Sequence, residues 1–214
     1  MDKYSILKQY YGHSAFRAGQ EELIDSILSG RDALCVMPTG GGKSLCYQIP
    51  ALLLPGITLV VSPLISLMKD QVAALKSAGV PAAYINSSLT SEQIRTVYAR
   101  TRKGAYKLIY VAPERLETNS FLSLMQEMDV SFLAVDEAHC ISQWGQDFRP
   151  SYLGIVDFIN ALPRRPIVAA YTATATKQVQ SDILRLLQLQ SPYRIVTGFD
   201  RPNLYFDVRR PKNK

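Results

Sequence analysis

The chain has 214 residues, of which 47% are hydrophobic and 20% charged, so it holds enough apolar material for a continuous core in one large domain or two small ones. Lysine and arginine outnumber aspartate and glutamate by 24 to 18, and the resulting net charge of +6 favours anionic partners such as nucleic acid, nucleotides or an acidic membrane face. The N-terminus lacks an apolar signal core and the most apolar stretch, 51–61, is interrupted by Pro55 and Gly56, so we expect a cytoplasmic protein that neither is secreted nor enters a membrane.

Predicted strands and helices alternate along the chain. Segments with apolar residues at helical spacing predict helices at 20–28, 44–53, 65–77, 91–102, 121–127, 152–161 and 177–187. Short, nearly continuous apolar runs predict strands at 33–37, 57–61, 82–85, 108–111, 132–135, 167–171 and 193–196. Strands without polar alternation are typical of a sheet covered on both faces by helices. The sequence therefore predicts one α/β domain with a doubly wound, mostly parallel sheet, flanked by helices, whose ligands lie at the carboxyl ends of the strands.

Two places depart from this regular pattern. Pro50 lies inside the predicted helix 44–53 and cannot donate a hydrogen bond to the carbonyl of Cys46, so we expect that helix to kink or restart there. The final segment, 209–214, carries four positive charges and no apolar residue except proline. It predicts a solvated tail or the start of a connection.

The three cysteines, Cys35, Cys46 and Cys140, are odd in number and widely spaced. That pattern indicates neither a disulfide framework nor a paired metal site. We expect them to be small buried apolar residues in a reducing compartment.

A glycine-rich loop, Met37-Pro-Thr-Gly-Gly-Gly-Lys-Ser44, follows the first predicted strand and precedes a helix. Triphosphate binding requires inward-pointing N–H groups, glycines for close approach, a lysine for the outer phosphates and a hydroxyl for magnesium. The loop supplies all of these with Thr39, Gly40, Gly41, Gly42, Lys43 and Ser44, and the helix dipole adds partial positive charge. The alternative is an ordinary glycine-rich turn with a surface lysine, but the strand, loop and helix context favours a site for ATP and Mg²⁺.

Two adjacent carboxylates, Asp136 and Glu137, directly follow the apolar strand 132–135. In a phosphate-loop enzyme the first carboxylate holds the magnesium ion, with Ser44, and the second orients or deprotonates the attacking water. A strand that merely ends in solvated acids is the alternative. Together with the phosphate loop, the pair predicts catalysis by Lys43, Asp136 and Glu137.

The acidic pair opens a longer run, Asp136-Glu-Ala-His139-Cys-Ile-Ser-Gln-Trp144-Gly-Gln-Asp-Phe148-Arg149-Pro150. This run closely resembles the RecQ group of superfamily-two DNA helicases. Further segments resemble motifs of that family in the same order: Phe16-Arg-Ala-Gly-Gln20, Val61-Ser-Pro-Leu-Ile-Ser-Leu-Met-Lys-Asp-Gln71, Val111-Ala-Pro-Glu-Arg-Leu116, Thr172-Ala-Thr-Ala175 and Phe199-Asp-Arg-Pro-Asn203. The resemblance covers nearly the whole chain and implies the RecA-like fold of the family's first motor domain.

The resemblance also implies how adenine is recognised. Gln20 would hydrogen-bond the adenine edge, Arg17 would lie near the base, and His13 occupies a position that often stacks on it. Without the resemblance, Gln20 and Arg17 would be read as the solvated start of a helix. Ala18 stands where the family often has proline.

Contact with DNA is implied for a second set of residues. Trp144, Phe148 and Arg149 combine aromatic faces for base stacking with a cation for phosphate, although the aromatic residues could instead fill the core. The resemblance places His139, Thr172 and Thr174 in a relay between nucleotide and DNA, where the alternatives are a buried histidine and helix caps. Lys69 and Gln71 are candidate contacts for the DNA backbone, with a solvated helix face as the alternative.

The resemblance implies a machine with two motor domains, of which residues 1–203 form the first and 204–214 begin the linker to the second. The second RecA-like domain contributes an arginine worth on the order of a thousandfold or more in hydrolysis rate. We therefore expect this chain alone to bind nucleotide weakly and to unwind nothing, whereas its parent protein would unwind single-stranded and forked DNA in the three-prime to five-prime direction, in DNA repair and recombination.

Two other functions remain open from the residues alone. A phosphate-loop kinase for a small molecule would share Lys43 and Asp136, but it would not need the aromatic run. A nucleotide-gated DNA-binding module would bind ATP without turnover, and Glu137→Gln would then change nothing measurable.

Overall fold

The structure, a computed structural model, describes residues 1–198 and residue 207. Its seven strands form one sheet in the order β3-β4-β2-β5-β6-β1-β7, and every neighbouring pair is parallel. The strands are β1 Ala33–Val36, β2 Ile57–Val61, β3 Ala82–Ile85, β4 Leu108–Val111, β5 Val130–Val135, β6 Ile167–Thr172 and β7 Tyr193–Val196. The predicted parallel, doubly wound sheet is confirmed. The family-like segment 199–203 and the predicted linker 204–214, apart from residue 207, lie outside the described residues.

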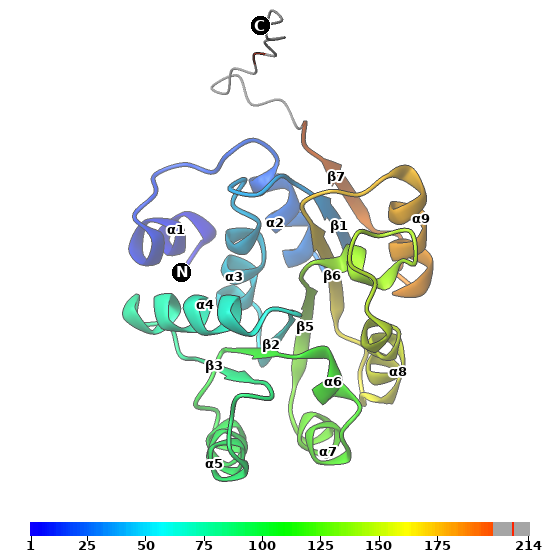
Figure 1. Cartoon of the computed structure of the whole chain (residues 1–214). Coiled ribbons are helices and arrows are strands. Elements are labelled where there is room, and N and C mark those ends of the chain that lie inside the picture. Colours follow the sequence, from blue (N-terminus) through cyan, green and yellow to red (C-terminus); the bar gives the residue numbers. More distant parts are fainter. Residues whose placement is uncertain (199–206, 208–214) are drawn as a thin grey trace, which may run out of the picture.

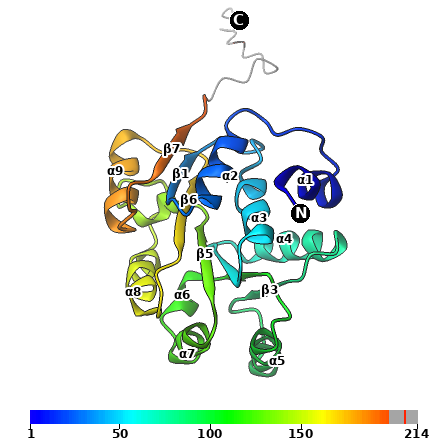
Figure 2. The same ribbon diagram turned by 180° about the vertical axis from the view of Figure 1, so that it is seen from behind.

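Helices cover both faces of the sheet (Figures 1 and 2). The α-helices are α1 Lys3–Tyr11, α2 Gln20–Leu28, α3 Lys43–Leu53, α4 Ile65–Ser77, α5 Ser91–Arg102, α6 Pro113–Leu116, α7 Asn119–Glu127, α8 Gly154–Ala161 and α9 Lys177–Leu186; two short 3₁₀ helices are η1 Ala138–Ile141 and η2 Pro150–Tyr152. Helices α2, α3 and α4 pack on one face and α5 to α9 on the other. Helix α1 packs outside α3.

The strands divide their side chains between the two faces. In β1, Leu34 and Val36 belong to the core beneath α5 to α9, whereas Ala33 and Cys35 belong to the core beneath α2 to α4. All four are buried, which explains why β1 shows no alternation of polar and apolar residues in the sequence. The three cysteines are buried, as expected.

Four elements are absent from the sequence prediction: α1, α6, η1 and η2. The predicted helix 152–161 begins later, at Gly154, because η2 precedes it. Helix α1 nevertheless carries local signals. The Asp2 carboxylate accepts the Ser5 N–H at 2.7 Å, and Gly12 ends the helix at a φ of 70°, a conformation that glycine adopts without steric cost.

Of the two outcomes expected at Pro50, a kink or a restart, the restart is wrong, because α3 runs as one helix from Lys43 to Leu53. Proline leaves the Cys46 carbonyl without its usual helical donor. The hydroxyl of Tyr171, on β6, donates to that carbonyl at 3.2 Å. A side chain of the sheet therefore replaces the missing backbone hydrogen bond.

Three chain segments important for function leave the sheet at its carboxyl edge. The Met37 N–H donates to the Thr172 carbonyl at 3.0 Å and the Asp136 N–H donates to the Val61 carbonyl at 2.9 Å, so the end of β1 is joined to that of β6 and the end of β5 to that of β2. Parallel topology thus brings residues about a hundred positions apart to one edge. Among the described residues, no helix is both long and apolar enough to cross a bilayer.

Candidate active site

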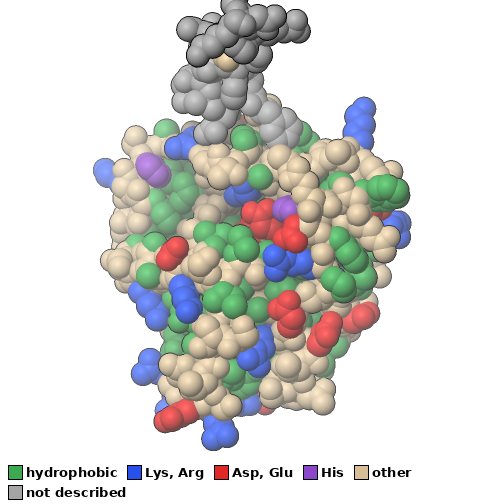
Figure 3. Space-filling model, viewed as in Figure 1, with side chains coloured by type: hydrophobic (Ala, Val, Ile, Leu, Met, Phe, Trp, Pro, Cys, Tyr) green, Lys and Arg blue, Asp and Glu red, His purple; other side chains and the backbone are tan. Residues whose placement is uncertain are grey.

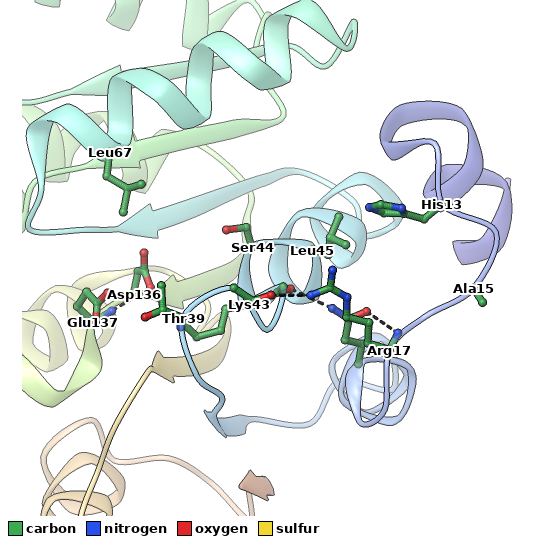
Figure 4. A pocket seen from close by; sticks show the side chains of 13 residues that line it. His13, Ala15, Arg17, Thr39, Lys43, Ser44, Leu45, Leu67, Asp136 and Glu137 are labelled. Carbon is green, nitrogen blue, oxygen red and sulfur yellow. Dashed lines mark hydrogen bonds between the residues drawn. The ribbon is translucent and has the colours of Figure 1, made fainter. Parts of the chain in front are cut away.

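A cavity of about 400 Å³ lies at the carboxyl edge of the sheet (Figure 4). It is lined by His13, Ala15, Arg17, Gln20, Thr39, Gly40, Gly42, Lys43, Ser44, Leu45, Leu67, Asp136 and Glu137. Every residue that the sequence predicts for nucleotide, metal or catalysis is in this set except Gly41. The phosphate loop and the acidic pair therefore meet in one pocket.

The three glycines of the loop are needed for different geometric reasons. Gly40 and Gly42 have φ values of 79° and 85°, in the left-handed region that side chains disfavour. Gly41 has no room for a side chain, because a Cβ atom there would lie 2.9 Å from the Pro38 carbonyl oxygen. The Lys43 ammonium donates to the Met37 carbonyl at 2.9 Å, so the lysine lies across the loop.

Gln20 holds the phosphate loop from the outside. Its side chain is 1% exposed, and its Nε2 atom donates to the carbonyls of Gly41 and Gly42 at 3.2 and 3.3 Å. Its Oε1 atom accepts the Arg17 N–H at 2.9 Å, and the Arg17 guanidinium donates to the Gly40 carbonyl at 2.5 Å. The implied contacts of Gln20 and Arg17 with adenine stay predictions; the structure shows that both residues position the loop.

His13 reaches the cavity from the segment that follows α1. Figure 4 shows its ring at the end of the cavity that lies away from Asp136 and Glu137. The phosphate loop lies between these two ends. That arrangement places the residues implied for adenine and those implied for catalysis on opposite sides of the loop.

Asp136 is buried at 7% exposure, and its Oδ1 atom accepts the Glu137 N–H at 3.0 Å. Burial, reinforced by the neighbouring Glu137 charge, raises the pKa of Asp136 from 3.8 to about 6, and the attraction of Lys43 offsets this only in part. Glu137 has a φ of 46°, a left-handed conformation that costs energy for a side-chain-bearing residue. This backbone turn allows both consecutive carboxylates to line the cavity.

A hydrogen-bonded relay leads away from Glu137. The His139 Nδ1 atom lies 3.3 Å from a Glu137 carboxylate oxygen and 2.9 Å from the Thr172 hydroxyl. That hydroxyl donates to the Thr174 carbonyl at 3.0 Å, so its oxygen accepts from His139 and Nδ1 carries the proton. The structure therefore joins Glu137, His139, Thr172 and Thr174 in one chain of contacts. On the face viewed in Figure 3, acidic side chains lie beside a histidine.

The aromatic loop, residues 142–149, lies next to this relay. Trp144 is 75% exposed, so the alternative that it fills the core is wrong; Phe148 is half-buried. Arg149 forms an ion pair with Asp147 at 2.8 Å and also donates to the Pro63 carbonyl at 3.4 Å. The loop thus presents an indole to solvent and connects to the segment that follows β2.

Lys69 and Gln71 lie on α4, outside the cavity. Lys69 is exposed, whereas Gln71 is half-buried and accepts a hydrogen bond from the buried Gln48 at 2.9 Å. Their contact with DNA stays a prediction. For Gln71 the structure shows a partner within the domain.

Sequence reasoning missed some residues at the site. Ala15, Leu45 and Leu67 line the cavity, and the Tyr152 hydroxyl donates to the Asp136 carbonyl at 2.8 Å. Leu67 comes from α4, and only the packing of that helix near the cavity reveals it. Ala15 and Leu45 lie beside predicted motif residues in the sequence, so proximity to His13 and Ser44 was the available signal.

The donors in the cavity fit a magnesium ion. The Ser44 hydroxyl and the Asp136 carboxylate both line it, and Mg²⁺ prefers such oxygen ligands while taking most of the others from phosphates and water. Two protein oxygens beside a phosphate loop are therefore a suitable set.

Comparison with known proteins gives consistent matches. Residues 17–182 match the family model described as DEAD/DEAH box helicase. The chain is 51% identical over 211 residues to the ATP-dependent DNA helicase RecQ of Bacillus subtilis (strain 168), covering 98% of this chain and 36% of the relative. It is 44% identical over 211 residues to the bifunctional 3'-5' exonuclease/ATP-dependent helicase WRN of Mus musculus, covering 96% of this chain and 15% of that relative. The chain spans about a third of the length of the first curated relatives that it matches.

Solved structures share the fold at low sequence identity. The helicase MrfA bound to DNA superposes with a TM-score of 0.73 at 16% identity, over 92% of this chain and 29% of that one. The Hef helicase domain of Pyrococcus furiosus gives a TM-score of 0.65 at 21% identity, over 84% of this chain and 38% of that one. These similarities support the fold alone.

Proposed function

The chain belongs to the DEAD/DEAH box helicase family, with a motor domain of the RecQ type, and from that premise we propose that it binds and hydrolyses ATP with Mg²⁺ to drive movement along DNA. The observation that carries the proposal is the meeting of Lys43, Ser44, Asp136 and Glu137 in one cavity. The position of each residue there suits one part of phosphoryl transfer to water.

The phosphate loop would bind the triphosphate. The N–H groups at the start of α3 and the dipole of that helix favour the negative charge of the phosphates, and the Lys43 ammonium compensates the charge of the outer ones. Ser44 and Asp136 would hold the magnesium ion, which neutralises charge on the phosphate oxygens when bound. Gln20 and Arg17 maintain the loop's shape, because their side chains bind three of its carbonyls.

Glu137 would act as the general base. The water oxygen attacks the γ-phosphorus, the bond to the bridging oxygen breaks with its electron pair leaving on ADP, and the water proton passes to the Glu137 carboxylate. His139 contacts that carboxylate through Nδ1 at 3.3 Å. It therefore orients the base and links it to Thr172.

We propose single-stranded and forked DNA as the nucleic-acid partner. Trp144, Phe148 and Arg149 supply stacking faces and a cation, close in sequence to the relay that ends at Glu137. The relatives' printed names describe DNA helicases, and unwinding from three-prime to five-prime, in DNA repair and recombination, is implied by the family resemblance. Work of this kind also needs the proposed second motor domain, because closure of a cleft between two domains converts hydrolysis into motion.

The test compares ATP hydrolysis with and without single-stranded DNA, in this chain and in a longer version that continues past Lys214 through a second motor domain. We expect the longer version to be stimulated by DNA and the 214-residue chain to turn over slowly. Glu137→Gln should abolish hydrolysis in the longer version while ATP binding is retained. The control is Glu127→Gln, which removes a surface carboxylate on α7 that pairs with Arg102.

Two results would count against the helicase proposal. If DNA did not stimulate ATP hydrolysis by the longer version, DNA binding and hydrolysis would not be coupled. Transfer of phosphate to a small acceptor would point to a kinase. ATP binding that Glu137→Gln leaves unchanged, with no turnover in either protein, would instead support the nucleotide-gated binding module.

A further inference from the structure

A buried polar pair connects α9 to the aromatic loop. Ser142 is fully buried and Asp182 is 8% exposed. The Ser142 hydroxyl donates to a carboxylate oxygen of Asp182 at 2.7 Å and accepts the Trp144 N–H at 3.2 Å. The other oxygen of Asp182 accepts from the exposed Arg185 at 3.1 Å. One hydroxyl therefore links a carboxylate on a helix to the backbone of the exposed tryptophan.

This pair determines which way the Ser142 hydroxyl points. A hydroxyl bonded to a carboxylate makes a charge-assisted hydrogen bond, stronger than a bond between neutral groups. With its proton directed at Asp182, the hydroxyl has its lone pairs left to accept from Trp144. Removing the carboxylate removes the group that fixes this orientation.

Trp144 depends on backbone contacts for its position, because its indole is 75% exposed and core packing does not hold it. The turn that carries it is tight. The Gly145 N–H donates to the Ser142 carbonyl at 2.9 Å, and a Cβ atom at Gly145 would lie 2.3 Å from the His139 carbonyl oxygen. The loop therefore folds back onto η1.

The same turn adjoins the relay to Glu137. The Ser142 N–H donates to the His139 carbonyl at 3.1 Å, while the His139 ring contacts Glu137 and Thr172. A cavity of about 100 Å³ lies between the loop and the start of α9, and His139, Trp144 and Thr174 are among the residues that line it. Two hydrogen bonds, both made by Ser142, therefore join the Trp144 backbone to the His139 backbone.

We propose that Asp182 is a positioning residue: through the Ser142 hydroxyl it holds the Trp144 backbone so that the indole is presented for stacking on a base of single-stranded nucleic acid. Asp182 itself touches neither nucleotide nor base. This inference rests on the proposed function, because it concerns the residue that positions the aromatic loop proposed there to contact DNA.

The 214-residue chain contains a single tryptophan, so its intrinsic fluorescence reports Trp144 directly. Asp182→Ala and Ser142→Ala remove the two partners of the bond. Asp182→Asn keeps an acceptor oxygen and serves as the conservative rescue. Ser181→Ala is the matched control, because this neighbouring hydroxyl on α9 is exposed and donates to the Lys177 carbonyl of its own helix.

Three quantities are measured for each variant: fluorescence anisotropy without ligand, affinity for short oligo(dT) from quenching of Trp144, and affinity for ATP. We expect both alanine variants at the pair to lower the anisotropy and to weaken oligo(dT) binding about three- to tenfold, the range that loss of one buried hydrogen bond produces. Affinity for ATP should stay unchanged. Asp182→Asn, which keeps an acceptor oxygen but loses the charge, should weaken oligo(dT) binding less than Asp182→Ala does.

Unchanged anisotropy in both alanine variants would overturn the proposal. The proposal would also be overturned if Asp182→Asn weakened oligo(dT) binding as much as Asp182→Ala does. An equal fall in ATP affinity would overturn it too, because it would indicate a general loss of order in the domain. If thermal unfolding shows that Asp182→Ala is not folded, Ser142→Ala tests the same bond. If the unaltered chain does not bind oligo(dT), its proposed DNA contact is wrong, and so is the proposal that Asp182 positions Trp144 for base stacking. A change in anisotropy would then show only that Asp182 orders the aromatic loop.

Discussion

Two residues of the cavity, Asp136 and Glu137, each carry a feature that costs folding free energy. Asp136 is buried beside another carboxylate, and Glu137 has a left-handed backbone. Neither feature stabilises the fold, because burial disfavours a charged carboxylate and a positive φ disfavours a side chain. Strain and charge that cluster at one cavity are typical of a functional site.

The raised pKa of Asp136 gives a stability prediction for the chain without nucleotide and magnesium. Its pKa rises from 3.8 to about 6 on folding, so folding favours the protonated form, and stability falls as the pH rises through this interval. Asp136→Asn removes that cost. At pH 7 we expect it to increase the free energy of unfolding by about 1–3 kcal/mol, while ATP hydrolysis is lost.

Urea unfolding at pH 7 and near pH 4.5 measures the effect. The gain should shrink towards pH 4, where the wild-type carboxyl is protonated in the folded chain. Asp157→Asn, at an exposed position on α8, is the control and should change stability by no more than about 0.5 kcal/mol at either pH. A destabilising Asp136→Asn at pH 7 would contradict the burial argument.

Among the helices and strands, a contact between distant segments replaces a hydrogen bond that the local sequence cannot form. Helix α3 continues through Pro50 because the Tyr171 hydroxyl supplies a donor to the Cys46 carbonyl. The aromatic ring of Tyr171 also packs edge-on against Tyr47 at 5.3 Å between centroids. The sheet therefore stabilises α3, the helix that directly follows the phosphate loop.

Tyr171→Phe tests this repair, since it keeps the ring and removes only the hydroxyl. It leaves the Cys46 carbonyl buried without a donor, and we expect a loss of about 1–3 kcal/mol in the free energy of unfolding. In the background of Pro50→Ala the loss should be smaller, because the new backbone N–H of residue 50 reaches the same carbonyl.

A double-mutant cycle measured by urea unfolding determines the coupling between these two positions. Tyr110→Phe is the control: its hydroxyl accepts from Gln48, and its cost should not depend on residue 50. Equal costs for Tyr171→Phe in both backgrounds would show that the hydroxyl does not replace the missing hydrogen bond.

The comparison of sequence and structure shows which features are local. Buried strands and the phosphate loop have strong sequence signals, so β2, β3, β4 and β7 lie where they are predicted, and Lys43 and Asp136 share a cavity. Strand order and the Ser142–Asp182 pair were not predictable, because they join distant segments whose proximity only packing determines. For Gln20 the sequence was informative only in part. Its residue type and motif suggested a ligand contact, but its hydrogen bonds to the phosphate loop depend on tertiary packing that the sequence does not show.

In the whole molecule, the proposed function depends on one arrangement of the sheet. Parallel strands bring the end of β1 and the end of β5 to the same edge of the sheet, with β6 between them. The phosphate loop and the acidic pair then share a cavity, and the backbone of His139, whose ring contacts Glu137, is joined through Ser142 to the exposed Trp144. The proposed nucleotide site and the proposed DNA contact thereby lie on adjoining surfaces of one domain.

The most direct measurement is calorimetric titration of the 214-residue chain with ATP and Mg²⁺, compared with Lys43→Ala and with Lys103→Ala, an exposed lysine at the end of α5. The account predicts that Lys43→Ala weakens ATP binding about tenfold or more, as expected for a lost charge-assisted contact, whereas Lys103→Ala binds as the unaltered chain does. Equal affinity in all three proteins would contradict the claim that this cavity holds the triphosphate.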